Sequence, residues 1–379
     1  MNDLIKKLLY ISYLYIFLFA CSENPAQQDD KNDIEFPSKG SYEGSYWPTN
    51  EWRSCAPEEV NMDPDLLMKS YDYAGGSEFN TYSILIIRKG YIVGEAYFND
   101  ASIHSLLQGY SFAKSFTNAI MGMAIDQQNI NSIDDYAYNY ISQWNKVTTD
   151  SVKKRVKIKH LLSMTAGLDW NYDSIRVDDY DMLDSGYYFE YVLTKSIIYE
   201  PGTHWNYSNG EAILISGILE AVLKMHVNLF ASQALFHKIG INQINWSSSA
   251  DVNGLTNTAY GIWATTRQYA KFGYLYLNKG EWDGEQVISR DWVNKSTKPV
   301  SQEFPHYGLY WWLLPGFENY TNYNIPDSTF FAVGARGQRI CIVPEKDLLI
   351  VRMADDSPEQ EATWDTLKFL SLIIESITE

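Results

Sequence analysis

The stretch that decides the fold of this chain is Gly109-Tyr110-Ser111-Phe112-Ala113-Lys114-Ser115-Phe116-Thr117. It contains the pattern Ser-x-x-Lys and leads into an apolar run that continues to Asp126. A segment that is apolar on nearly all sides is typical of a helix buried in a protein core. We therefore expect a buried helix over residues 111–126 that begins at Ser111.

Ser111 and Lys114 share one face of this helix, because residues three positions apart are neighbours. Burial disfavours a charged lysine and lowers its pKa. A neutral amine beside a hydroxyl can act as general base for a nucleophile, and the N–H groups at a helix start can stabilise a developing anion. In the alternative, the Lys114 amine extends to solvent and has no role. The pattern also occurs at residues 151–154, in a basic stretch that we interpret as solvated.

A competing interpretation of the same serine is weaker. The sequence from Gly109 to Ala113 lacks only the last glycine of Gly-x-Ser-x-Gly, the nucleophile turn of α/β-hydrolases. That turn needs a strand directly before it. Residues 104–108 are not typical of a strand, so we disfavour this fold.

A second motif lies in Pro201-Gly202-Thr203-His204-Trp205-Asn206-Tyr207-Ser208-Asn209. Tyr-x-Asn also occurs by chance elsewhere, but only Tyr207 follows Pro-Gly in a loop that enters a helical pattern. A tyrosine near a cation can ionise below its ordinary pKa of about 10. Tyr207 could thus transfer a proton between the serine and a leaving group, and Asn209 could donate a hydrogen bond to a substrate carbonyl.

A third motif is Gly334-Ala335-Arg336-Gly337-Gln338-Arg339-Ile340, at the start of a β-branched segment. Glycine at position 337 would let the backbone approach a ligand closely. The backbone N–H of Gln338 would then be an edge donor, and with the N–H of Ser111 it would form an oxyanion hole.

The remaining elements follow from local patterns. Alternating apolar and β-branched residues predict strands near both ends of the chain, and amphipathic patterns with terminal glycines predict helices in the middle. The expected strands are 81–87, 91–98, 328–333, 338–343 and 348–353, and the expected helices are 158–165, 211–224, 266–278 and 360–377. The strands of both ends should form one antiparallel sheet with a helical region inserted between them.

Together, the three motifs resemble the serine β-lactamase-like hydrolases of the class C type, which include β-lactamases, D-alanyl-D-alanine carboxypeptidases, esterases and some amide hydrolases. The resemblance covers residues 47–375 and includes Trp47-Pro48-Thr49 and the segment 160–168. It implies an α+β fold, an antiparallel β-sheet from N- and C-terminal strands flanked by helices, with a large inserted helical domain and the site at their junction. It also implies Ser111 as nucleophile, Lys114 and Tyr207 as proton-transfer partners, the amides of Ser111 and Gln338 as oxyanion donors, and no cofactor.

One position departs from the family pattern. The third motif of these proteins carries Lys or His two residues before the glycine, where this chain has Ala335. Arg336 follows it and could reach the substrate or face away, because neighbouring strand residues point to opposite sides. Without a cation at Ala335 we expect substrates that carry a carboxylate to be poorer than neutral esters or amides.

The N-terminus resembles a bacterial lipoprotein signal. Lys6 and Lys7 precede an apolar run over residues 8–20, shorter than the ~20 residues of a membrane span. It ends in Leu18-Phe19-Ala20-Cys21. We expect a signal peptide over 1–20, an acylated Cys21, a flexible tether over 21–45 and an exported protein anchored in a bacterial membrane, facing the periplasm or the exterior. Simple cleavage and secretion is the alternative.

The rest, residues 46–379, should be a single catalytic unit. Its α/β part comprises about 46–104 and 300–379, and its helical part about 105–299. The chain has 379 residues and a net charge of −17, which disfavours binding to nucleic acid. Its six histidines form no metal-binding motif, so we expect no metal. Cys55 and Cys341 could be bridged or free. The acidic cluster Asp178, Asp179, Asp181 and Asp184 is interpreted as a solvated face.

Two functions remain open. The first is a serine hydrolase that cleaves an ester or amide of a small molecule or peptide through an acyl-enzyme on Ser111. The second is a non-catalytic β-lactamase-like lipoprotein that binds a peptidoglycan peptide or a β-lactam without turnover. Ala335 favours the second function, whereas the combination of Ser111, Lys114 and Tyr207 favours the first.

Overall fold

The computed structural model describes residues 34, 36–147, 151–172, 176–247 and 251–378. The predicted signal peptide, Cys21 and the first part of the predicted tether lie outside the described residues. The later part of that tether contacts the folded unit. The Gly40 N–H donates to the Glu59 carboxylate at 2.8 Å, and the Glu43 N–H donates to the Tyr91 hydroxyl at 3.2 Å.

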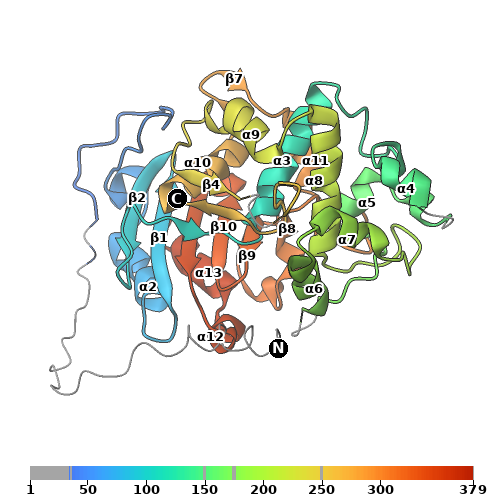
Figure 1. Ribbon diagram of the computed structural model, residues 1–379. Coiled ribbons are helices and arrows are strands. Elements are labelled where there is room, and N and C mark those ends of the chain that lie inside the picture. Colours follow the sequence, from blue (N-terminus) through green and yellow to red (C-terminus); the bar gives the residue numbers. More distant parts are fainter. Residues whose placement is uncertain (1–33, 35, 148–150, 173–175, 248–250, 379) are drawn as a thin grey trace, which may run out of the picture. The chain divides into compact units, whose positions relative to one another are not determined.

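Strands from both ends of the described chain form one six-stranded antiparallel sheet (Figure 1). The strand order is β2-β1-β11-β10-β9-β8. This arrangement confirms the predicted α+β class. The strands are β1 (Thr81–Arg88), β2 (Tyr91–Tyr97), β8 (Trp312–Leu313), β9 (Phe330–Gly334), β10 (Gln338–Val343) and β11 (Leu348–Ala354).

The sheet is buried on both faces, as the apolar strands require. Side chains alternate between the faces of a strand, so Ile84 and Ile86 of β1 join one hydrophobic core while Leu85 and Ile87 join the other. Helices α2 (Pro64–Ala74) and α13 (Thr366–Glu375) complete the first core, and α10 (Thr266–Leu277) packs into the second.

The closing helix predicted over residues 360–377 is two helices, α12 (Pro358–Thr363) and α13. Asp365 interrupts it, because its carboxylate accepts hydrogen bonds from the N–H groups of Leu367 and Lys368, both at 2.9 Å, and so begins a new helix. The prediction missed this cap.

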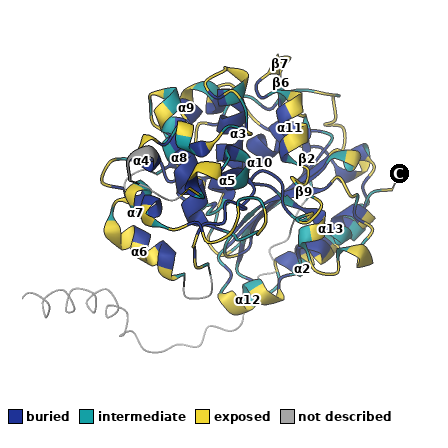
Figure 2. Cartoon of the chain, turned by 90° about the vertical axis from the view of Figure 1, so that its right-hand side faces the viewer, coloured by how far each residue is buried: buried dark blue, intermediate teal, exposed yellow. Residues whose placement is uncertain are grey.

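The helical region lies between β2 and β8 in the chain. Its central helix α3 (Phe112–Asp126) is buried at every position from Phe112 to Ala124, as predicted. Figure 2 shows the contrast between this buried centre and the exposed α12. The other helices are α4 (Ser142–Val147), α5 (Ile158–Leu162), α6 (Val177–Ser185), α7 (Tyr188–Thr194), α8 (Asn209–Leu223), α9 (Val227–Ala231) and α11 (Arg290–Ser296).

Residues before Ser111 do include a short strand, β3 (Leu107–Gln108), where we expected none. It pairs antiparallel with β5 (Ile262–Ala264), which also pairs with β4 (Ile244–Trp246). This three-stranded sheet is separate from the six-stranded one. The α/β-hydrolase alternative requires the serine to follow a strand of the central sheet. Ser111 does not, so that alternative is excluded.

Among the described residues, no single helix has the length and apolar composition to cross a membrane; only α8 with the segment Val227–Phe236 meets the criteria, as a pair bent by 68°. Cys55 and Cys341 are buried free thiols.

Candidate active site

Ser111 stands at the start of α3, where the chain turns from β3 into the buried helix. Tyr110 before it adopts a left-handed conformation with φ 46°. Gly109 has no room for a side chain, since a Cβ there would lie 2.7 Å from the Tyr269 hydroxyl. Although serine is a common helix cap, the Ser111 hydroxyl makes no capping bond and is left for other partners.

Lys114 is the partner of that hydroxyl. Its side chain is 1% exposed, which excludes the alternative in which the amine reaches solvent. Lys114 Nζ donates to Ser111 Oγ at 3.0 Å, to Asn209 Oδ1 at 2.7 Å and to the Ala259 carbonyl oxygen at 2.8 Å. The pKa of Lys114 is lowered to about 7, mainly by burial; the charge of Asp179 opposes the shift and that of Arg176 adds to it.

Tyr207 lies over the same amine, with Lys114 Nζ 4.8 Å from its ring centroid. Its ring packs against Tyr172 and Trp312, at centroid distances of 4.8 and 5.9 Å. Burial among these aromatic rings raises the pKa of Tyr207 above its ordinary value. Interaction with the Ser111 hydroxyl lowers the pKa, but offsets only part of the rise. The tyrosine is therefore a neutral phenol, and the expectation that it ionises easily was wrong.

Asn209, the first residue of α8, is turned toward Lys114. Its amide nitrogen donates to both carboxylate oxygens of Asp179 at 3.0 Å, while its oxygen accepts from Lys114. The residue is only 4% exposed. Its amide group is thus engaged within the protein, where we had expected a donor for a substrate carbonyl.

The sequence analysis did not assign Asp179 or Arg176 to this site, although both line the cavity over Ser111. Asp179 is 6% exposed and Asp178 8% exposed, so the interpretation of both as a solvated face was wrong. Arg176, which precedes α6, reaches the same site with its guanidinium 4.9 Å from the Tyr172 ring centroid. An acidic segment without clear periodicity gives no signal of which side chains turn inward, so nothing in the sequence distinguished Asp179 from its neighbours.

The third motif contributes to the site through Ala335, which lines the same cavity as Ser111. Gly334 before it lies close to the loop that carries Ser111, because a Cβ on Gly334 would be 2.3 Å from the Gly109 carbonyl oxygen. The side chain of Gln338 faces β11 instead. Its oxygen accepts from the Ala354 N–H at 3.0 Å and its amide nitrogen donates to the Ala354 carbonyl.

Neither Arg336 nor Gly337 lines that cavity. Arg336 is exposed and forms an ion pair with Asp355. Gly337, at φ +87°, makes room for the buried ion pair of Arg352 and Asp356, since a Cβ would lie 2.2 Å from Arg352 Nη1. The need for glycine here is thus explained by packing inside the protein.

The cavity over Ser111 has a volume of about 250 Å³. Its wall joins the first motif, α6, the start of α8 and the third motif. It is lined by Gln108, Tyr110, Ser111, Tyr172, Arg176, Asp179, Tyr180, Leu183, Asn209, Tyr260 and Ala335. The described part of the chain contains no group of three or more His, Cys, Asp or Glu side chains that could hold a metal.

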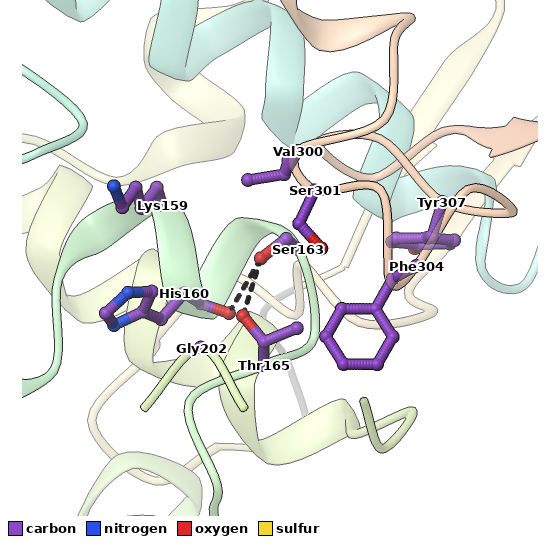
Figure 3. Close-up of a pocket in the computed structure, with 9 residues that line it drawn as sticks. All are labelled: Lys159, His160, Ser163, Thr165, Gly202, Val300, Ser301, Phe304 and Tyr307. Carbon is purple, nitrogen blue, oxygen red and sulfur yellow. Dashed lines mark hydrogen bonds between the residues drawn. The ribbon is translucent and has the colours of Figure 1, made fainter. Parts of the chain in front are cut away.

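A second cavity, of about 180 Å³, lies beside α5 (Figure 3). Its polar groups are already engaged: the Ser163 and Thr165 hydroxyls bond to each other at 2.8 Å, and Lys159 pairs with Asp134. Burial and nearby lysines lower the pKa of His160 to about 4, and its Nδ1 accepts from the Lys157 N–H. This arrangement stabilises the turn after α5 and supplies no activated nucleophile.

Comparison with known proteins places the chain in a family. The profile of the Beta-lactamase family matches residues 67–372. The chain is 23% identical over 312 residues to an uncharacterized protein of Alkalihalophilus pseudofirmus, covering 73% of this chain and 85% of that protein.

Solved structures share the fold. A Bacillus anthracis structure named as a 6-aminohexanoate-dimer hydrolase superposes with a TM-score of 0.67 at 18% identity, over 91% of this chain and 92% of that one. EstCE1, a hydrolase with promiscuous acyltransferase activity, gives 0.68 at 14% identity, over 83% and 98%. The family resemblance expected from the motifs is confirmed: the chain belongs to the Beta-lactamase family, whose fold it shares with known hydrolases.

Proposed function

We propose that this protein is a serine hydrolase that cleaves esters or amides through an acyl-enzyme on Ser111. The observation that carries the proposal is the buried Lys114 amine, 3.0 Å from the Ser111 hydroxyl oxygen and with a pKa of about 7. A base with a pKa near the working pH is the most effective in proton transfer. The neutral Lys114 amine, which can accept the serine proton, is then accessible near neutral pH.

In the first step, Ser111 Oγ attacks the substrate carbonyl carbon while its proton passes to the neutral Lys114 amine. The tetrahedral intermediate collapses when the bond to the leaving group breaks. Lys114 returns the proton to the leaving group, directly or through the Tyr207 hydroxyl, which gives one proton and receives another. A water molecule then attacks the acyl carbon and gives its proton to Lys114. The bond between that carbon and Ser111 Oγ breaks, the carboxylic acid leaves, and Lys114 returns the proton to Ser111.

The developing oxyanion needs two donors. Ser111 supplies one from its backbone N–H at the start of α3. For the second we propose the backbone N–H of Ala335 in place of that of Gln338, because Ala335 lines the cavity over Ser111 and Gln338 does not. A backbone donor makes no demand on the side chain, so alanine is compatible with this role.

Substrate preference depends on charge at the cavity wall. Position 335 carries no cation, and Arg336 is bound to Asp355 outside the cavity. Arg176, the residue before α6, does line the cavity. We therefore propose that a carboxylate on the substrate is met, if at all, from the α6 side. The preference for neutral esters expected from Ala335 and the presence of Arg176 in the cavity wall make opposite predictions about substrate charge.

The non-catalytic alternative is the weaker one. A pure binding protein has no use for a lysine buried at 1% exposure beside a serine, because burying an amine is unfavourable. We retain from the sequence the proposal that the enzyme is exported and anchored at Cys21.

A fluorophosphonate probe tests the proposed function. It reacts only with an activated serine: Oγ displaces fluoride from phosphorus and Lys114 takes the proton. The wild type should gain one adduct by intact mass and hydrolyse a short-chain nitrophenyl ester. Ser111→Ala should lose both, and Ser151→Ala, a change at an exposed serine, should lose neither. A wild type that binds a β-lactam reversibly but forms no adduct would establish the binding protein instead.

A further inference from the structure

Asp179 forms no hydrogen bond to Ser111 or Lys114, yet a single side chain, that of Asn209, links it to both. Asn209 donates to both Asp179 oxygens at 3.0 Å and accepts from Lys114 Nζ at 2.7 Å. Lys114 in turn donates to Ser111 Oγ at 3.0 Å. The order is thus Asp179, Asn209, Lys114, Ser111, and it connects α6 to α8 and then to α3.

The direction of each hydrogen bond in this series follows from the donors and acceptors available. An ionised carboxylate can only accept hydrogen bonds, whereas an amide has a donating and an accepting end. Asp179 therefore holds the Asn209 nitrogen, which leaves the Asn209 oxygen toward Lys114. Without the carboxylate the amide could rotate by half a turn and present its N–H₂ group to the amine. In that orientation the N–H₂ group of Asn209 would face the protonated Lys114 amine, so that two hydrogen-bond donors would oppose each other.

We propose that Asp179 is a positioning residue of the hydrolase, which orients the Asn209 amide so that its oxygen holds the Lys114 amine against Ser111. The proposal rests on the function proposed above. All three supporting side chains are buried, with exposures of 6% for Asp179, 4% for Asn209 and 1% for Lys114. Little of each side chain is open to solvent, although Asp179 and Asn209 border the cavity, so contacts within the protein dominate the orientation of the amide.

Asp179 also acts on Lys114 through its charge. The charged groups that act on the amine are Asp179, which raises its pKa, and Arg176, which lowers it, and both belong to the α6 side of the cavity. Tyr207 faces the amine from the loop before α8 as a neutral phenol. Removal of the Asp179 charge should therefore lower the pKa of Lys114 further. A residue with a purely structural role would not change it.

The experiment measures the rate of fluorophosphonate labelling of the full chain against pH. In Asp179→Asn the rate on the alkaline plateau should fall about 10–100-fold, by analogy with the loss seen when a group that orients a metal-binding side chain is removed. The acid limb of the profile should move to lower pH. Asp178→Asn is the matched control: its carboxylate is also buried in α6 but binds the Asn171 N–H and Lys195, and it should change neither plateau nor limb.

A second variant separates orientation from folding. Asn209→Ala removes the amide on which Asp179 acts, so it should reproduce the loss on the plateau, and Asp179→Asn should add little in that background. If Asp179→Asn does not fold, an Asn209→Ala enzyme with wild-type plateau rate overturns the proposal by itself. If it folds, an unchanged plateau and limb overturn it.

The controls distinguish failure of the proposed function from failure of the proposed role of Asp179. A wild type that forms no adduct at Ser111 refutes the proposed function, and the role of Asp179 with it. A wild type labelled at Ser111, together with an Asp179→Asn enzyme that behaves identically or fully independent losses in the double variant, refutes only the role of Asp179.

Discussion

Lys114 Nζ lies 3.0 Å from Ser111 Oγ, one helical turn along α3, and no capping bond competes for that hydroxyl. The helix thus determines the spacing, and the packing around it determines the charge. Because α3 is enclosed by α8, α11 and the sheet, its lysine is held where the neutral amine is favoured. This one contact gives several measurable consequences.

The activity should fall on the acid side with a midpoint near pH 7. Burial lowers the pKa of Lys114 to about 7, and only the neutral amine, present above that value, accepts the serine proton. The measurement is kcat/KM for a neutral nitrophenyl ester between pH 5 and 9. Lys271→Met is the control, since Lys271 is also buried with a pKa lowered to about 8 but binds the Thr49 and Gly240 carbonyls away from the cavity. If the acid limb moves in Lys271→Met, the titrating group is Lys271 and the assignment to Lys114 is wrong.

Lys114 and Tyr207 should behave as one proton-transfer unit. Lys114→Ala and Tyr207→Phe should each lower kcat by roughly 10²–10⁴-fold, the span of acid–base groups. The double variant should lose little more than the worse single variant, because residues that act together are not additive. Phenylalanine keeps the ring contacts with Trp312 and Tyr172, so the comparison isolates the hydroxyl. Losses that multiply in full would show that the two residues act separately.

Gly337→Ala should destabilise the fold without a direct effect on the nucleophile. The new Cβ would lie 2.2 Å from Arg352 Nη1 and 2.3 Å from Asp356 Oδ2, and disruption of a buried ion pair costs about 3–5 kcal/mol. Gly284→Ala is the control, because Gly284 has a similar φ of +80° but open space around it, and it should lose only about 1–2 kcal/mol. Urea unfolding measures both. Equal losses would mean that backbone conformation, and not the ion pair, requires the glycine.

Substrate charge should be sensed by Arg176 and not by Arg336. The comparison is kcat/KM for nitrophenyl monosuccinate against nitrophenyl butyrate. A charge-assisted hydrogen bond of about 1.5–3 kcal/mol corresponds to about 10–150-fold, so Arg176→Gln should lower the ratio by that factor. Arg336→Gln should leave it unchanged. If neither variant changes a ratio already in favour of butyrate, the site prefers neutral acyl groups, as the missing cation at Ala335 predicts.

Cys21 should carry the membrane anchor. Its basis is the short apolar run that ends in Leu18-Phe19-Ala20-Cys21. Expressed as the full chain in a bacterium, the wild type should sediment with membranes, and Cys21→Ser should move it to the soluble fraction. Sedimentation that the substitution does not change would refute acylation at this residue.

The sequence by itself determined the fold class and the pair at the centre of the site. The apolar α3 run, the alternating terminal strands and Ser-x-x-Lys are local patterns, and the distance from Ser111 to Lys114 follows from helix geometry alone. The strands β1, β2, β10 and β11 lie within one residue of their predicted bounds. Caps were harder: Asp365 divides the last helix through side-chain bonds that periodicity does not record.

Only the tertiary structure decided the surroundings of that pair. Whether Lys114 is charged depends on burial by segments distant in the chain, and so does the neutral state of Tyr207 inside its ring of aromatic side chains. Asp179 and Arg176 reach the cavity because α6 packs there. The polar, acidic composition of that segment gives no sign of this packing. Ala335 lines the cavity over Ser111 while the Gln338 side chain binds β11, because the turn between β9 and β10 sets the direction of each residue. Side-chain environment is a property of contacts between distant segments, and no local pattern contains it.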